Sequence, residues 1–318
     1  MRITFWGTRG SLPAPLDTNE FKIKAKRLLQ NAKDVDLNDD DAIDTYLDKC
    51  PLPDSITFGG NTPCVEITDG DNQVILDCGS GLRELGRDMM KRGFKPGGRI
   101  DILQTHTHWD HIMGFPFFAP AYTNGTEIHI HGLHPNLKDR FEQQMDLIHF
   151  PITMNEMKSN ITFHQLAHDE EYELGPFKVT NKALHHPGGS YSYRIESGGK
   201  SIVFATDGEY INLNEEFETY IDFYRDANVL IFDAMYATLE KTIERENFGH
   251  STPVIGINIA LTSNVENLFL FHHDPESNDH HVYDAFDQAR KFLESEKRHF
   301  PDSKLKIMIA YDTLSYDV

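Results

Sequence analysis

Short hydrophobic runs alternate with polar, glycine-rich turns along most of the 318-residue chain. Runs of about four to eight residues that are rich in Val, Ile and Phe and are bounded by turn residues are typical of β-strands. The two glycines of Ser197–Lys200 predict a hairpin turn between two such runs. The pattern predicts strands at Ile3–Phe5, Cys64–Ile67, Val74–Leu76, Ile100–Leu103, Glu127–His131, Phe177–Thr180, Tyr191–Ile195, Ile202–Ala205, Val229–Phe232, Leu268–Phe271 and Lys306–Ile309.

Two longer segments, Ser80–Lys91 and Tyr283–Glu296, carry the spacing of an amphipathic helix. They lie between predicted strands, and we find neither a long linker nor an internal repeat. Mixed strands and helices of this kind indicate a layered α/β fold. We therefore expect one domain that spans residues 1–318.

Residues 16–56 differ from the rest of the chain because their pattern is helical. Asp17 and Glu20 have the spacing of a capping box. A hydrophobic face follows at Phe21, Ala25, Leu28 and Ala32. Asp39 is placed to cap a second helix, which Cys50-Pro51 ends. We expect a helical hairpin inserted between the first two strands, either as surface decoration or as a lid over a substrate cleft.

The composition is that of a globular protein, with 39% hydrophobic and 25% charged residues. No hydrophobic run approaches the roughly 20 residues that span a bilayer, and the N-terminal sequence lacks the pattern of a signal peptide. Cys50, Cys64 and Cys78 have neither metal-site spacing nor an even-numbered disulfide framework. We therefore expect a cytoplasmic protein without a membrane partner.

The net charge of −20 argues against binding of nucleic acid along a broad basic face, because neutralisation of phosphates dominates such binding. A small anionic substrate remains compatible with this charge, since two divalent metal ions would reverse the local field inside a cleft.

Three histidines and a carboxylate occur within the stretch Thr105–His111, THTHWDH, directly after a predicted strand. In an extended segment residues i and i+2 project to the same side, so His106 and His108 face one direction and Asp110 follows them. A turn into a helix can bring His111 round to an adjacent position. Imidazole and carboxylate ligands suit zinc, manganese or iron, and the stretch predicts a metal site.

This stretch resembles the signature of the metallo-β-lactamase fold family, a four-layer αββα sandwich that holds metals in a groove at one edge. The later motifs of that family occur in the expected order. His186 in HHPGGSYSY resembles the third histidine, Asp207 in IVFATDGE the bridging aspartate, and His272 in LFLFHHDP the last histidine. His185 and His273 are the neighbouring alternatives for two of these positions.

The resemblance implies a dinuclear centre with two divalent ions, zinc first, with manganese or iron as alternatives. It places one ion on His106, His108 and His186, and the second on Asp110, His111 and His272, with Asp207 bridging both. In such a centre a hydroxide that bridges the metals acts as the nucleophile, and Asp110 helps to orient it.

Two further motifs are similar to the tRNase Z and phosphodiesterase branch of the family. Ile75–Gly81 resembles its LxDCGxG stretch, and Asp233 together with His250 in GHST resembles an acidic residue that orients a histidine. In that branch this histidine protonates the leaving oxygen, a role that suits an imidazole with a carboxylate partner. The resemblance therefore implies a phosphodiesterase with His250 as general acid.

The expected substrate is a small phosphodiester, such as a cyclic nucleotide or another cyclic phosphate. In tRNase Z the arm that clamps tRNA lies between the third histidine and the bridging aspartate, and here that interval holds only two strands and a turn. A large nucleic acid is therefore not expected, and a homodimer is expected only by analogy with relatives. Phe115, Phe117 and Phe118 belong to the core or form an apolar lip that stacks a base.

Four other functions remain open. A hydrolase of the same fold could act on a thioester, lactone or β-lactam, and a tRNase Z-like ribonuclease is a further alternative. A di-iron redox protein would carry Glu where His108 stands, so the sequence departs from that pattern. A metal-bearing structural module would not need His250.

Overall fold

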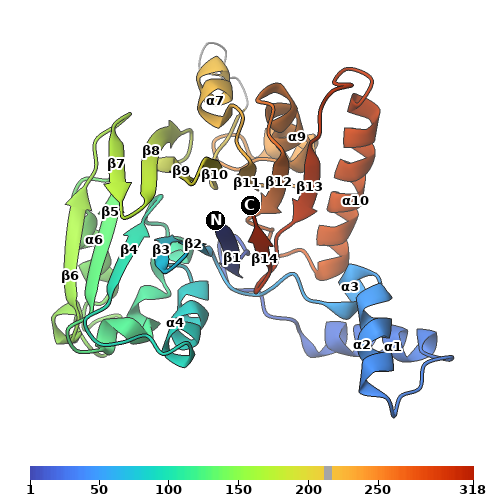
Figure 1. Ribbon diagram of the computed structural model, residues 1–318, viewed down its shortest axis with the longest axis horizontal. Helices are drawn as coiled ribbons and strands as arrows, with labels where there is room; N and C mark the ends of the chain where they lie inside the picture. The colour runs from blue at the N-terminus through green and yellow to red at the C-terminus, as the bar shows by residue number, and fades with distance from the viewer. Residues whose placement is uncertain (211–216) are drawn as a thin grey trace.

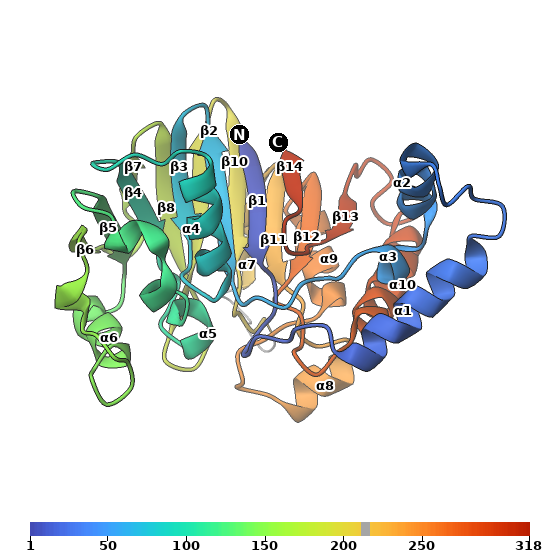
Figure 2. The same ribbon diagram turned by 90° about the horizontal axis from the view of Figure 1, so that it is seen from below.

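The computed structural model describes residues 1–210 and 217–318 and contains two mixed sheets of seven strands each (Figures 1 and 2). The first sheet has the order β14 (Ser315–Asp317), β1 (Arg2–Gly7), β2 (Cys64–Asp69), β3 (Asn72–Leu76), β4 (Arg99–Leu103), β5 (Glu127–Gly132) and β6 (Asn160–Gln165). The second has the order β13 (Lys306–Ile309), β12 (Asn267–Phe271), β11 (Val229–Asp233), β10 (Lys200–Ala205), β9 (Ser190–Ser197), β8 (Phe177–Leu184) and β7 (Glu171–Leu174).

The two sheets pack face to face, and helices cover their outer surfaces. One core lies between the sheets and includes Phe5, Val65, Phe204 and Ile231. A second core joins the first sheet to α4 (Gly81–Lys91) and α6 (Leu137–Gln144). A third joins the second sheet to α7 (Phe217–Tyr224), α9 (Pro253–Thr262) and α10 (Asp279–Glu296). The expected four-layer αββα sandwich is confirmed.

The hydrophobic pattern explains this layering. In β11 every residue is buried, with Ile231 in the core between the sheets and Leu230 and Phe232 in the core beneath the helices. A strand covered on both faces requires such a continuous hydrophobic run. At the β9–β10 turn, Gly198 and Gly199 have φ of 56° and 75°, a conformation that glycine adopts without steric cost.

The predicted helical insertion lies between β1 and β2 and consists of α1 (Thr18–Asn31), α2 (Asp40–Lys49) and a short α3 (Leu52–Ser55). The Asp17 side chain caps α1 by accepting the backbone N–H groups of Asn19 and Glu20, and Asp39 caps α2 in the same way. The insertion packs against α10 at the edge of the second sheet (Figure 1).

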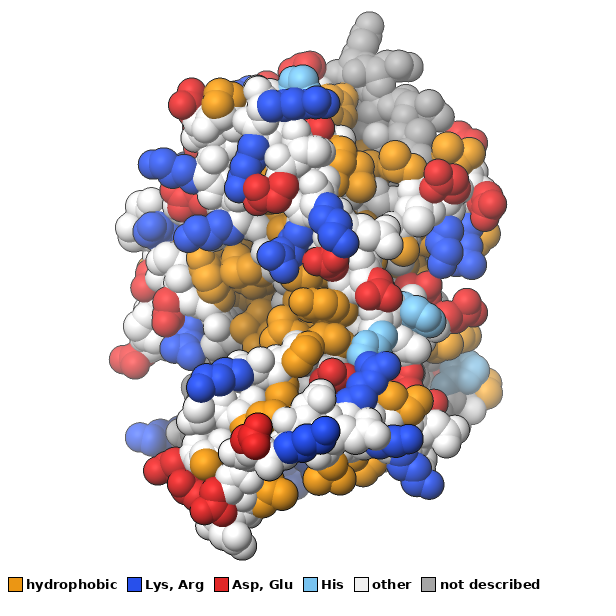
Figure 3. All heavy atoms as spheres, turned by 90° about the vertical axis from the view of Figure 1, so that its right-hand side faces the viewer, with side chains coloured by type: hydrophobic (Ala, Val, Ile, Leu, Met, Phe, Trp, Pro, Cys, Tyr) orange, Lys and Arg blue, Asp and Glu red, His pale blue; other side chains and the backbone are white. Residues whose placement is uncertain are grey.

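The hydrophobic face expected on α1 is partly buried, because Ala32 is buried and Ala25 and Leu28 are half-buried. Phe21 remains 60% exposed, and Figure 3 shows hydrophobic side chains among charged ones on the side that carries α10 and the insertion. The buried residue of α1 itself is Lys24. Its ammonium forms an ion pair with Asp279 at the start of α10, and Asp279 also pairs with Arg9.

Among the described helices, none is both long and apolar enough to cross a membrane.

Candidate metal centre

The carboxyl ends of several strands meet at one edge of the sandwich and carry the predicted site residues. Strands β3 and β4 are parallel in the first sheet, and β10, β11 and β12 are parallel in the second. The segments that follow β4, β8, β10 and β12 place their side chains in one cluster. This cluster contains His106, His108, Asp110, His111, His186, Asp207 and His272.

The first group of potential ligands consists of His106, His108 and His186, whose ligand atoms all lie within 4.8 Å of one another. His186 Nε2 and His108 Nδ1 are 3.0 Å apart. His106 Nε2 is buried without a hydrogen-bond partner among the described residues, and it lies 3.7 Å from Asp207 Oδ2. An unpartnered imidazole nitrogen that faces a carboxylate in this way fits a metal ligand.

The second group consists of Asp110, His111, Asp207 and His272, and all four residues are buried. His111 Nε2 lies 3.2 Å from Asp110 Oδ2 and 3.2 Å from Asp207 Oδ1. His272 Nε2 lies 3.3 Å from each of the same two oxygens. Because Asp207 presents Oδ1 to this group and Oδ2 to the first, it stands between the two. The donor set fits two divalent ions.

Backbone conformation at the strand ends helps to aim these side chains. Asp207 and His272 have φ of 53° and 60°, and Asp77, which follows β3, has φ of 61°. Residues other than glycine rarely adopt this left-handed region, and such strain concentrates at functional sites.

The second nitrogen of several imidazoles is held by a group that the sequence did not identify. Asp77 Oδ2 lies 2.7 Å from His111 Nδ1, and the Gly249 carbonyl accepts a hydrogen bond from His186 Nδ1 at 2.9 Å. Such partners fix the tautomer and orientation of a ligating histidine. Glu209 supports Gly249 in turn, because its carboxylate accepts the backbone N–H groups of Asn247 and Gly249.

Asp233 and His250 lie at the border of the cluster, as the sequence predicts. His250 Nδ1 is 2.8 Å from Asp233 Oδ2 and 3.9 Å from Asp207 Oδ2. Burial lowers the pKa of His250, but the neighbouring carboxylates, Asp233 foremost, outweigh it and raise the pKa to about 9. The protonated form of this imidazole is therefore favoured at neutral pH.

Asp233, His250, Asp207 and His272 also lie close enough together to hold an ion. The two oxygens of Asp233, however, already accept three backbone N–H groups, from Asp207, Met235 and Ser251, in addition to His250. A carboxylate saturated in this way is a poor metal ligand. Its geometry suits the orientation of His250 instead.

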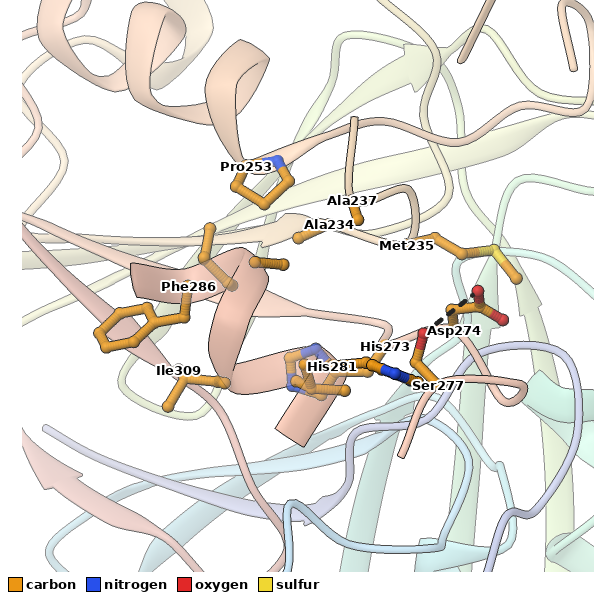
Figure 4. A pocket seen from close by; sticks show the side chains of 13 residues that line it. Ala234, Met235, Ala237, Pro253, His273, Asp274, Ser277, His281, Phe286 and Ile309 are labelled. Carbon is orange, nitrogen blue, oxygen red and sulfur yellow. Dashed lines mark hydrogen bonds between the residues drawn. The ribbon is translucent and has the colours of Figure 1, made fainter. Parts of the chain in front are cut away.

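The neighbouring histidines that the sequence left as alternatives lie outside the cluster. His185 is exposed. His273 is buried, and its Nε2 donates a hydrogen bond to the Ala310 carbonyl at 2.8 Å. Figure 4 shows it in a separate small pocket with Pro253 and Ile309. Burial, with a contribution from Arg9, lowers the pKa of His273 to about 3, so this side chain is neutral.

Two of the three aromatic residues after His111 belong to the core, and the ring of Phe117 contacts Phe150. Phe115 and Phe118 are fully buried in the core beneath the first sheet, whereas Phe117 is 57% exposed.

Ser190 is buried, and the Gly188–Gly189 turn borders His108, since a Cβ atom on Gly188 would lie 3.9 Å from His108 Nε2.

Comparison with known proteins identifies similar sequences and folds. Residues 72–273 match the model of the β-lactamase superfamily domain. Ribonuclease Z of Picrophilus torridus is 24% identical over 267 residues, which cover 70% of this chain and 82% of that protein. The metallo-β-lactamase-fold protein YhfI from Bacillus subtilis superposes with a TM-score of 0.63 at 19% identity, covering 99% of this chain and 98% of that chain. The short form of human tRNase Z gives a TM-score of 0.61 at 18% identity, covering 100% and 99%.

Proposed function

The chain belongs to the β-lactamase superfamily, and from this premise we propose that it is a metal-dependent hydrolase of small phosphodiesters. The observation that carries the proposal is the hydrogen-bonded pair of Asp233 and His250 beside the histidine cluster. Hydrolysis of a phosphodiester expels an alkoxide, which needs a proton as it leaves. A thioester hydrolase has less need of such an acid, because a thiolate leaves without protonation more readily than an alkoxide does.

We assign one divalent ion to His106, His108 and His186 and a second to Asp110, His111 and His272, with Asp207 shared between them. Zinc suits this set of imidazoles and carboxylates best, and manganese and iron are the alternatives. When bound, two such ions neutralise charge on the phosphate oxygens and lower the pKa of water.

The side chains around the proposed ions have separate roles, one in proton donation and one in orienting the attacking water. Asp233 holds His250 through Nδ1, which leaves Nε2 to donate a proton to the departing oxygen. Asp110 accepts the backbone N–H of Ser11 at 2.8 Å and is fixed beside His111. We assign to Asp110 the orientation of the attacking water.

The proposed substrate is a small phosphodiester, with cyclic nucleotides and other cyclic phosphates as the first candidates. The tight β9–β10 turn leaves no long segment between His186 and Asp207, and the net charge of −20 disfavours a long polyanion. The name of the relative from Picrophilus torridus favours a ribonuclease as the second candidate.

Hydrolysis assays with the metal-loaded protein test the reaction class. We expect turnover of bis-p-nitrophenyl phosphate and of a cyclic nucleotide, without cleavage of a precursor tRNA or of a thioester. Thioester turnover without phosphodiester turnover would overturn the proposal, and specific tRNA cleavage would establish the ribonuclease.

The role of His250 is tested by varying the leaving group. His250→Ala should retain both metals and lose roughly 100-fold or more in kcat on substrates that release an alkoxide. Substrates that release p-nitrophenol need little protonation and should lose much less. His185→Ala, which alters an exposed imidazole beside the cluster, is the matched control. An equal loss on both kinds of substrate would contradict the assigned role.

A further inference from the structure

A groove of about 630 Å³ borders the chain segment that carries His108. Its walls are the loop and short helix α5 (Trp109–Ile112) on one side and α6 on the other. Thr107 and Trp109 line it and are the two chain neighbours of His108. Both residues are covalently linked to His108, so the groove borders the segment that carries this candidate ligand.

Trp109 gives the groove an aromatic surface. Its side chain is 77% exposed although it is one of only two tryptophans in the chain. The exposed indole of Trp109 presents an aromatic face to the groove. The planar face suits stacking of an aromatic ring, and nucleobases stack on such faces irrespective of their identity.

Arg140 gives the groove a cation. Its Nη1 donates a hydrogen bond to Thr107 Oγ1 at 2.9 Å, and no carboxylate of residues 1–210 or 217–318 forms an ion pair with it. A half-buried guanidinium without a carboxylate partner suits a phosphate, which it can bind through two N–H donors.

Two amides complete the lining. Gln143 and Gln144 face the groove from α6, and Gln144 Nε2 is buried without a hydrogen-bond partner among the described residues. Amides can pair with the polar edge of a base.

We propose that this groove is a nucleotide subsite: a base next to the scissile phosphodiester stacks on Trp109, and a second phosphate of the same substrate pairs with Arg140. The inference rests on the proposed function and narrows its substrate to short nucleotides with two phosphates, such as linear or cyclic dinucleotides. The scissile phosphate occupies the metal centre, and the neighbouring nucleoside occupies the groove.

Binding is tested by fluorescence, because Trp6→Phe leaves Trp109 as the sole tryptophan. The metal-loaded Trp6→Phe protein is titrated with the dinucleotide pApA made with a hydrolysis-resistant phosphorothioate linkage. Stacking should quench the Trp109 emission at saturation. An abasic counterpart with the same phosphates should leave the emission unchanged, and equal quenching by both compounds, or by neither, would overturn the subsite.

Kinetics separate the two contacts. Trp109→Ala should raise KM roughly tenfold for both pApA and ApA and leave the abasic substrate unaffected. Arg140→Gln should raise KM roughly tenfold for pApA, which carries the second phosphate, and leave ApA unaffected. Phe21→Ala and Arg87→Gln remove an exposed ring and an exposed cation elsewhere and serve as matched controls.

The outcomes also separate this inference from the proposed function. A wild-type protein that hydrolyses no phosphodiester refutes the function and the subsite together. If the wild type hydrolyses bis-p-nitrophenyl phosphate and both dinucleotides while Trp109→Ala and Arg140→Gln leave every KM unchanged, the function stands and the subsite falls. A change in oligomeric mass in Trp109→Ala, with KM unchanged, would identify the groove as a protein interface and overturn the proposal.

Discussion

Gly249 occupies a position in which any side chain would strike a candidate metal ligand. A Cβ atom there would lie 2.0 Å from His186 Nδ1, the atom that donates to the Gly249 carbonyl. The His186 ring would have to turn, and its Nε2 would leave the first group of ligands. Replacement of Gly249 by alanine therefore tests whether this glycine is needed for metal binding or only for folding.

We expect Gly249→Ala to lose about one metal ion per chain, as measured by elemental analysis after dialysis. Gly93 has the same φ of 83° and nothing within 4 Å of its added Cβ, so Gly93→Ala is the matched control. Both substitutions should lower the free energy of unfolding by about 1–2 kcal/mol through the left-handed φ. Equal metal content in the two variants would show that His186 does not depend on Gly249.

Substitution of Asp77 is a second test at the level of single residues. It accepts hydrogen bonds from the backbone N–H of Thr105 and from Gln104, and it holds His111. Asp77→Asn keeps the shape but removes the charge that makes the imidazole a stronger ligand, so metal affinity should fall about 10- to 100-fold. Competition with a chromophoric chelator measures this change. Asp71→Asn removes an exposed carboxylate nearby, and a loss of equal size there would contradict the assignment.

Gly249 and Glu209 show which residues of the site the sequence does not reveal. His106, Asp207 and His272 could be predicted because each side chain belongs to a short motif at a strand end. Gly249 acts through its carbonyl and its missing Cβ, and Glu209 acts on backbone N–H groups of a distant loop. Such roles depend on how separate segments pack together, so they cannot be predicted from the residue type alone.

At the scale of elements, the strands that hydrophobicity predicts include some buried on both faces, such as β11, and some with one buried face, such as β8. β6 alternates exposed and half-buried residues, β7 is mostly polar, and β14 has only three residues. Their pairing is imposed by β5, β8 and β1, so their own sequences carry little signal. The insertion is the reverse case: its helices were predictable from caps and periodicity, but its attachment was not, because it depends on the buried Lys24.

We therefore predict that the ion pair of Lys24 stabilises the fold and holds the insertion in place. Its ammonium pairs with Asp279, which also accepts from Arg9 and from the backbone N–H of Phe58. Lys24→Ala leaves a buried carboxylate with one cation fewer and should cost about 3 kcal/mol of unfolding free energy. It should also speed protease cleavage within residues 18–56, detected by mass spectrometry. Lys26→Ala alters an exposed residue of the same helix and serves as the control. Similar cleavage rates in the two variants would show that Lys24 does not hold the insertion in place.

At the scale of the whole molecule, the candidate centre joins the two sheets. His106, His108, Asp110 and His111 follow β4 of the first sheet, while His186, Asp207 and His272 follow strands of the second. Bound ions would therefore link two layers that are otherwise held together by the hydrophobic core between them. Without ions, the carboxylates of Asp110 and Asp207 face a cluster of imidazoles.

Removal of metal should accordingly destabilise the entire fold and not only the groove. An ion present at 1,000 times its dissociation constant contributes about 4 kcal/mol, which corresponds to roughly 6 °C in Tm for a chain of this length. We expect calorimetry to show a fall of at least this size after chelation, and a return when zinc is added back. Asp207→Ala, which lacks the shared ligand, should show a smaller difference between the two states. A wild-type Tm that is independent of metal would mean that ions, if bound, do not link the sheets, because a bridge between them must resist their separation.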